Sequence, residues 1–151
     1  MNLMNAYKSV VMEYLKADSA MFVNADCRIQ VNGVKEDPDK NGFRLSCDAI
    51  AVDFRHHAVY LCEIGFAQGL HALLKRLGAW TKNWEVIKNG LRCNCKLPST
   101  WRVYVWLFVP KECLDVLDAK LEELRSRSGS AFKVKVTALE DVQPWRSSAW
   151  V

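Results

Sequence analysis

Two carboxylates stand inside otherwise apolar, strand-like stretches of this sequence and could together bind a metal ion. Asp48 lies in RLSCDAIAVDF (44–54) and Glu63 lies in AVYLCEIGF (58–66). Burying an unpaired charge is costly, so a carboxylate in such a stretch needs a partner. If the two stretches form a hairpin that turns after Arg55, Asp48 lies directly opposite Glu63, with Cβ atoms about 5 Å apart. Two like charges so placed repel each other unless a proton or a cation lies between them.

A divalent metal ion is the simplest cation for two converging carboxylates, and Mg²⁺ commonly uses one or two of them. We therefore predict that Asp48 and Glu63 bind Mg²⁺ or Mn²⁺. Two plainer interpretations stay open: either carboxylate pairs with a nearby Lys or Arg, or the hairpin has another register. A shift of one residue would separate the pair, and Arg55-His56 is not a favoured two-residue turn. Asp53 is out of phase with Asp48, and we expect it to stabilise the end of the turn.

Composition sets wide limits on the class of protein. The chain has 151 residues, half of them apolar and a quarter charged, which is typical of one globular domain with a buried core. No apolar run approaches the ~18 to 20 residues that cross a bilayer, and the N-terminal stretch lacks the features of a signal peptide. We therefore expect a cytoplasmic protein without a membrane partner. The formal net charge of +4 permits a polyanionic partner without requiring one.

Hydrophobic periodicity predicts a single α/β domain over residues 1–151, with the order helix, three strands, helix, strand, helix, strand. Apolar residues recur at steps of three and four from about Ala67 to Leu91, which predicts one long helix. Because this helix separates strand 58–66 from strand 101–110, we expect these two strands to be parallel. The three earlier strands should be antiparallel, so the sheet is mixed. The remaining predicted elements are a helix at 4–16, strands at 27–33 and 132–139, and a helix that begins after Pro110.

The hairpin CDAIAVDF–RHH–AVYLCEIGF (47–66) resembles the core hairpin of the PD-(D/E)XK, or restriction-endonuclease-like, nuclease superfamily. That signature has an acidic residue in one strand and E-x-K at the end of the next, on an αβββαβ frame that residues 4–110 match in order. The C-terminal helix and strand would be additions to this core. The resemblance implies that Asp48 and Glu63 bind Mg²⁺, which activates a water to attack a DNA phosphodiester bond. It thus implies a metal-dependent deoxyribonuclease with DNA as partner, and it leaves a homodimer open.

Glycine stands where this superfamily has its lysine, because the sequence reads Glu63-Ile64-Gly65. Some superfamily members take the equivalent group from the following helix. Four polar residues there fall on one helical face, opposite the leucine and tryptophan stripe: Gln68, His71, Lys75 and Lys82. Gln68 is nearest to the strand end and Lys75 has the right charge, so we predict Asp48, Glu63, Gln68 and Lys75 as the catalytic residues.

Two other interpretations stay open, and the missing lysine favours the first of them. In the first, the chain is a catalytically inactive protein with a nuclease fold that binds nucleic acid or a protein partner. In the second, it is a structural subunit whose two carboxylates form ordinary ion pairs. The tail that contains Trp145 and Trp150 has no periodicity from which to predict a role.

Overall fold

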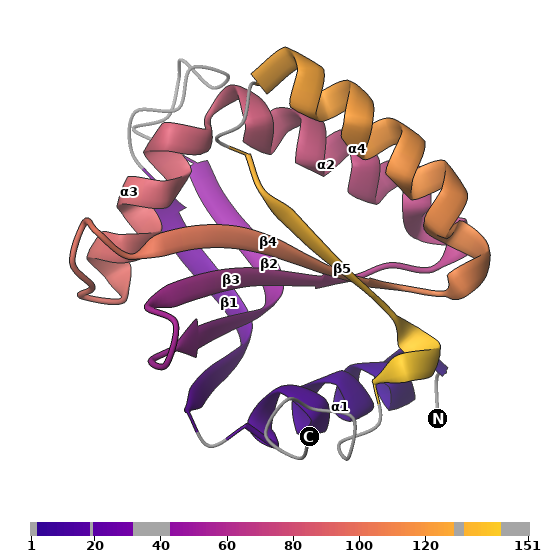
Figure 1. Ribbon diagram of the computed structural model, residues 1–151, viewed down its shortest axis with the longest axis horizontal. Coiled ribbons are helices and arrows are strands. Elements are labelled where there is room, and N and C mark those ends of the chain that lie inside the picture. The colour runs from indigo at the N-terminus through magenta and orange to yellow at the C-terminus, as the bar shows by residue number, and fades with distance from the viewer. Residues whose placement is uncertain (1–2, 19, 32–42, 129–131, 143–151) are drawn as a thin grey trace.

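The computed structural model describes residues 3–18, 20–31, 43–128 and 132–142. Within these ranges one five-stranded sheet has the strand order β1-β2-β3-β4-β5. Helix α1 lies on one face of the sheet, and helices α2, α3 and α4 lie on the other (Figure 1). The chain is therefore an α/β protein. Trp145 and Trp150 lie outside the described residues.

The elements follow one another in the predicted order of types. The helices are α1 (Leu3–Lys16), α2 (Leu70–Lys82), α3 (Trp84–Asn94) and α4 (Leu114–Ser128). The strands are β1 (Met21–Val31), β2 (Phe43–Asp53), β3 (Ala58–Ile64), β4 (Arg102–Val109) and β5 (Val134–Ala138). Short 3-10 turns, η1 (Ala67–Gly69), η2 (Lys111–Cys113) and η4 (Leu139–Asp141), join or end them.

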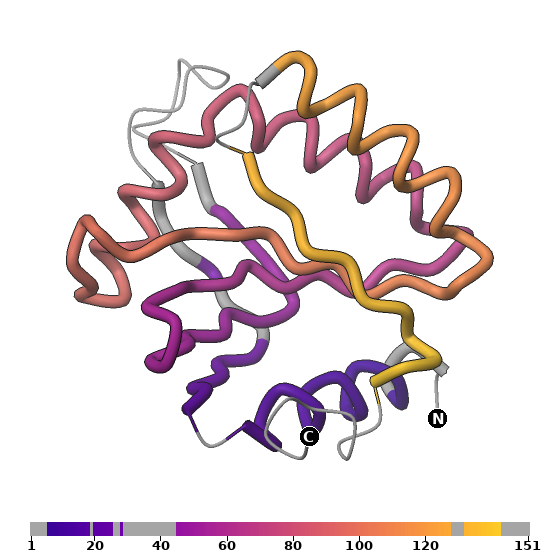
Figure 2. The backbone as a smooth tube through the Cα atoms, in the orientation of Figure 1, coloured from indigo at the N-terminus to yellow at the C-terminus, as the bar shows by residue number. Residues whose placement is uncertain are grey.

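The directions of the strands confirm the prediction of a mixed sheet. β2 is antiparallel to β1 and to β3, whereas β4 is parallel to β3 and to β5. Each parallel pair is connected through helices, α2 and α3 in one case and α4 in the other, as Figure 2 traces. Parallel strands require such a crossover, because a tight turn reverses the direction of the chain.

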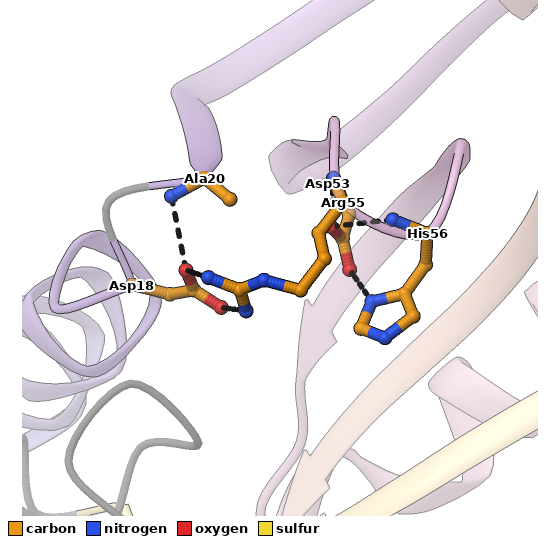
Figure 3. A network of polar contacts seen from close by, with 5 residues as sticks. All are labelled: Asp18, Ala20, Asp53, Arg55 and His56. Carbon is orange, nitrogen blue, oxygen red and sulfur yellow. Dashed lines mark hydrogen bonds and ion pairs between the residues drawn. The ribbon is translucent and has the colours of Figure 1, made fainter.

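The turn between β2 and β3 covers residues 54–57, so the rules for a two-residue turn do not apply to it. Oδ1 of Asp53 accepts hydrogen bonds from the backbone N–H groups of Arg55 (2.9 Å) and His56 (3.2 Å). Oδ2 of Asp53 lies 2.7 Å from Nδ1 of His56 (Figure 3). His57 has a φ of 51°, in the left-handed region that such a turn needs. The predicted role of Asp53 at the turn end is thus confirmed.

A second carboxylate ties this turn to the end of α1. The guanidinium of Arg55 donates to both carboxylate oxygens of Asp18, at 3.0 and 3.1 Å (Figure 3). Asp18 is only 4% exposed and also accepts from the N–H of Ala20 at 2.9 Å. The bidentate geometry fixes the direction in which the chain enters β1.

The core has one cluster on each face of the sheet. The larger cluster packs the apolar faces of α2, α3 and α4 on the sheet, with Leu61, Val105 and Leu107 at its centre. The smaller cluster packs α1 against the other face, around Trp106 and Phe108. β3 and β4 are therefore covered on both sides, as expected for strands apolar on nearly every residue. Within the described ranges, every helix is too short or too polar to cross a membrane.

Two predicted elements differ from the structure. The long helix predicted for 67–91 is broken at Asn83, whose φ and ψ are −120° and 23°. Its backbone N–H bonds the carbonyl of Trp80, and its side-chain amide bonds the carbonyl of Ala79. The apolar stripe continues through the break from Trp80 to Trp84, so periodicity does not reveal it. The break lets α3 pack against β1.

The first strand also differs, because β1 begins at Met21 rather than at Cys27. Asn24, a poor strand former, interrupts its apolar pattern and hides it in the sequence.

Candidate functional site

The register of β2 against β3 is the one that brings Asp48 and Glu63 together. The paired positions run from Asp53 opposite Ala58 to Ala49 opposite Cys62, and the next position along each strand is Asp48 and Glu63. The pairing ends there. Instead, the backbone N–H of Ile64 donates a hydrogen bond of 2.8 Å to Oδ2 of Asp48. The Asp48 carboxylate thus replaces a strand-to-strand contact and is fixed beside the end of β3.

β2 changes its alternation at Asp48. Leu45 and Cys47 pack in the core cluster beneath α2, α3 and α4, whereas Ala49 and Ala51 pack on the α1 side. A regular strand would keep these four residues on one face, because alternate side chains point to the same side. The irregularity lies at the residue whose side chain bonds the neighbouring backbone.

Glu63 is the most deeply buried acidic residue at this end of the sheet, with 2% of its surface exposed. Burial, then the negative charge of Asp48 and a hydrogen bond between the two carboxyl groups, raise the pKa of the Glu63 carboxyl to about 8, against the opposing effect of Arg76 and Lys8. Its Oε1 is buried and has no hydrogen-bond partner among the described residues. Buried polar atoms without a partner are uncommon in folded proteins, so this oxygen is available to a ligand, an ion or a water.

Two basic side chains approach the carboxylates loosely. Nη2 of Arg76, from α2, lies 3.5 Å from Oε2 of Glu63, and Nζ of Lys8, from α1, lies 4.0 Å from Oδ1 of Asp48. Both distances are at the long end for an ion pair, and the Arg76 side chain is about half exposed. The carboxylates therefore have cations nearby without being enclosed by them.

The pair faces two hollows. The larger, about 530 Å³, lies along the start of α2 and includes Gln68, Arg76 and Glu112 among its lining residues. The smaller, about 110 Å³, is lined by Arg28, Ser46, Cys47 and Arg76 in addition to the two carboxylates. Asp48, Glu63 and Arg76 border both hollows, so a ligand in either would meet all three.

Gly65 forms part of the larger cleft, and a side chain at this position would press on the packing of α2. A Cβ atom at this position would lie 2.8 Å from Cδ2 of Leu73 and 3.4 Å from Cγ1 of Val109. The place where the resemblance expects a lysine side chain is therefore filled by Leu73 of α2.

The structure separates the two predicted replacements for that lysine. Gln68 and Glu63 both line the larger cleft. Lys75 does not line it, but borders a separate hollow with Lys82 on the other side of α2. His71 is exposed and lines neither hollow at the carboxylates. The position of Lys75 gives no support to a catalytic role for it.

Arg76 is the residue that the sequence reasoning missed. It lies at the edge of the polar face of α2, between the exposed Lys75 and the buried Leu77. A long cationic side chain at the border between the polar and apolar faces of a helix can bury its aliphatic part and still extend its charge to the end of a strand. This border position in the sequence is the signal that could have identified Arg76.

The two carboxylates fit Mg²⁺ better than a metal that needs an all-protein cage. Among the described residues, no group of three or more His, Cys, Asp or Glu side chains could hold a metal ion. A structural zinc site would need four such ligands, whereas Mg²⁺ keeps several waters and uses one or two carboxylates. The unpartnered Oε1 of Glu63 supplies a hard oxygen of the right kind.

No protein-family model matches the chain, and comparisons with curated proteins and with solved structures likewise give no match.

Proposed function

We propose that this protein is a Mg²⁺-dependent hydrolase of DNA phosphodiester bonds, with a divergent restriction-endonuclease-like core. The order α1, three antiparallel strands, α2 and a parallel β4 agrees with that core. The observation that carries the proposal is the buried, incompletely bonded Glu63 beside Asp48, at the edge of an open cleft.

Each residue of the site has a defined task in this proposal. Asp48 and Glu63 would hold the Mg²⁺ ion, which supplies Lewis-acid stabilisation of the charge that develops on the phosphodiester. Asp48 is positioned for this by the N–H of Ile64, and Arg76 lies on the cleft side of Glu63. Its planar guanidinium can donate two hydrogen bonds to a phosphate, which makes it the substitute for the missing lysine charge. The amide of Gln68 can orient a water molecule in the same cleft.

A second function is favoured by the packing around Gly65. Because Leu73 fills the place of the lysine side chain, the site lacks the group that superfamily members use beside the metal. Lys8 and Arg76 could also balance the two carboxylates without a metal. The alternative is therefore a non-catalytic protein of the same fold that binds nucleic acid or a protein partner.

Calorimetric titration tests the metal site directly. We expect the wild-type chain to bind Mn²⁺ at a single site and Asp48→Asn to lose that binding, because the variant keeps the shape of Asp48 and removes its charge. Equal binding by both proteins, or no binding by the wild type at millimolar concentration, would show that the carboxylates are not a metal site.

Cleavage assays with matched variants of α2 separate the two functions. Arg76→Ala should lower Mg²⁺-dependent cleavage of DNA by more than tenfold, about 1.4 kcal/mol of barrier. Lys75→Ala, one residue away but outside the cleft, should leave the rate unchanged. Gln68→Ala should lower the rate without affecting the binding of Mn²⁺. If the wild type binds Mn²⁺ but does not cleave single-stranded, double-stranded or nicked DNA, the non-catalytic function is the correct one.

A further inference from the structure

A hollow of about 1230 Å³ lies at the other end of the sheet. It is formed by the first residues of β3, β4 and β5 and by the last turns of α4. β5 begins to pair with β4 only at Val105, so residues 102–104 of β4 have no β5 partner and border the open space. Glu63, near the far end of β3, lies about 15 Å along the strand from this end.

Basic side chains outnumber acidic ones in the lining of this hollow, which we call the basic groove. Arg102, Arg125, Lys133 and Lys135 line it, whereas Glu122 is the one acidic side chain among its described lining residues. Glu122 lies 3.7 Å from Arg125 in a surface ion pair. Arg102 and Lys133 make no ion pair with any described carboxylate. The groove thus carries an excess of positive charge with at least two cations available to a ligand.

Aromatic rings line the groove and continue beyond it. Inside the groove, the rings of Tyr60 and Tyr104 stack with centroids 5.5 Å apart. Nζ of Lys135 lies 4.1 Å above the ring of Trp106 and 5.9 Å from that of Tyr60. Cations and flat rings therefore occur in one surface.

A row of further rings, which we call the aromatic row, adjoins the groove at His57. His57 lines the groove and stacks on Trp101 at 5.0 Å, Trp101 contacts Phe54 at 5.4 Å, and Phe54 contacts Phe22 at 5.3 Å. Phe22 is 66% exposed and Phe54 is 49% exposed. Large rings exposed to this degree and next to one another mark a binding surface.

We propose that the basic groove and the aromatic row together bind single-stranded nucleic acid. The phosphates would lie against Arg102, Lys133 and Lys135, and unstacked bases would stack on the exposed rings. Sequence-tolerant binding of single strands combines these two features, a positive groove and aromatic platforms. A duplex keeps its bases stacked inside and offers the rings no free base faces. An acidic protein would match the same charge and could also contact the rings, so competition by polyglutamate is the outcome that would indicate such a partner.

Fluorescence anisotropy with a labelled oligothymidylate of about 16 nucleotides tests this proposal, in EDTA so that no cleavage occurs. The test variant is Arg102→Glu with Lys133→Glu. Its control is Lys75→Glu with Lys120→Glu, which changes the net charge equally at exposed positions outside the groove. At about 0.1 M salt the groove variant should raise the Kd more than tenfold and the control less than twofold. The groove variant should also show a weaker salt dependence. The slope of log Kd against log salt concentration should fall by about 0.7 for each phosphate that no longer contacts a cation.

Base stacking is tested separately. Phe54→Ala should raise the Kd at least about fivefold, the low end of the effect of one stacked base. Unlabelled duplex and polyglutamate should compete poorly, whereas oligouridylate shows whether RNA is bound as well as DNA.

The proposal is overturned if the groove and control variants bind equally, if Phe54→Ala has no effect, or if polyglutamate competes as well as the oligonucleotide. It stands apart from catalysis. Tight binding in EDTA by an Asp48→Asn variant would support the groove even if the proposed hydrolase function failed.

Discussion

Replacing Gly65 by alanine tests how tightly the end of β3 is packed against α2. The added Cβ would lie 2.8 Å from Cδ2 of Leu73, about 1 Å closer than an ordinary carbon–carbon contact. Leu73 is 1% exposed and cannot move into solvent, so the contact must be relieved by a strained rotamer or a small shift of α2. Such overpacking costs about 1–3 kcal/mol of the free energy of unfolding. The backbone of Gly65 contributes nothing to this cost, since its φ is not in the left-handed region.

The matched control is Gly78→Ala, the same substitution in the middle of α2. Nothing lies within 4 Å of a Cβ at Gly78, so the variant gains helix propensity and should be more stable by up to about 1 kcal/mol. Urea denaturation of both variants should therefore give changes of opposite sign.

A double-mutant cycle assigns the cost to one contact. Leu73→Ala alone should destabilise the protein by about 2–5 kcal/mol, because it leaves a cavity. In the double variant the shortened residue 73 leaves room for the new methyl group at Gly65. The effects of the two substitutions on the free energy of unfolding should therefore be non-additive by about 1 kcal/mol or more. A neutral or stabilising Gly65→Ala, or simple additivity with Leu73→Ala, would refute the packing argument. The site would then have room for the first atom of a side chain at this position.

Two further predictions concern charge. Since the Glu63 pKa rises to about 8 in the folded chain from its ordinary 4.5, the folded state holds a proton that the unfolded state has released between these values. In metal-free buffer, the free energy of unfolding should therefore fall by up to about 5 kcal/mol as the pH rises from 4.5 to 8. Glu63→Gln should abolish this fall. Urea denaturation at several pH values measures the free energy of unfolding. Arg55→Ala should destabilise the protein by about 1 kcal/mol by removing the bidentate partner of the buried Asp18, whereas removing the exposed Arg127 pair should change the denaturation midpoint little. Equal effects of the two arginine variants would argue against a structural role for the Asp18 contact.

The parts of this structure that the sequence predicts depend on local patterns. Runs such as WRVYVWLFV leave few alternatives to a buried strand, and a helical segment between two such runs favours a parallel crossover. The register that brings Asp48 and Glu63 together follows from placing the turn between the predicted strands 44–54 and 58–66. It is correct although Arg55-His56 is a poor two-residue turn, because Asp53 and a left-handed His57 build a longer one.

The parts that were not predictable depend on contacts distant in sequence. The break at Asn83 leaves the apolar period intact, and only the packing of α3 on β1 shows why the helix must turn there. Arg76 lies 3.5 Å from Glu63 because α2 packs near the end of β3, and the periodicity of the sequence does not predict that contact. Gly65 is explained in the same way, since the residue that fills its space comes from the following helix.

The order of the strands across the sheet is also their order along the chain. No strand has to be inserted between two others that formed earlier, so the sheet can grow at one edge while the chain is being synthesised. β1, β2 and β3 can assemble as local hairpins, and each later strand then meets an edge that already exists. The pairing of Asp48 with Ile64 belongs to this early part, whereas Arg76 and the basic groove need the elements that follow. Synthesis would therefore bring the two carboxylates together before Arg76 and the rest of α2 are present.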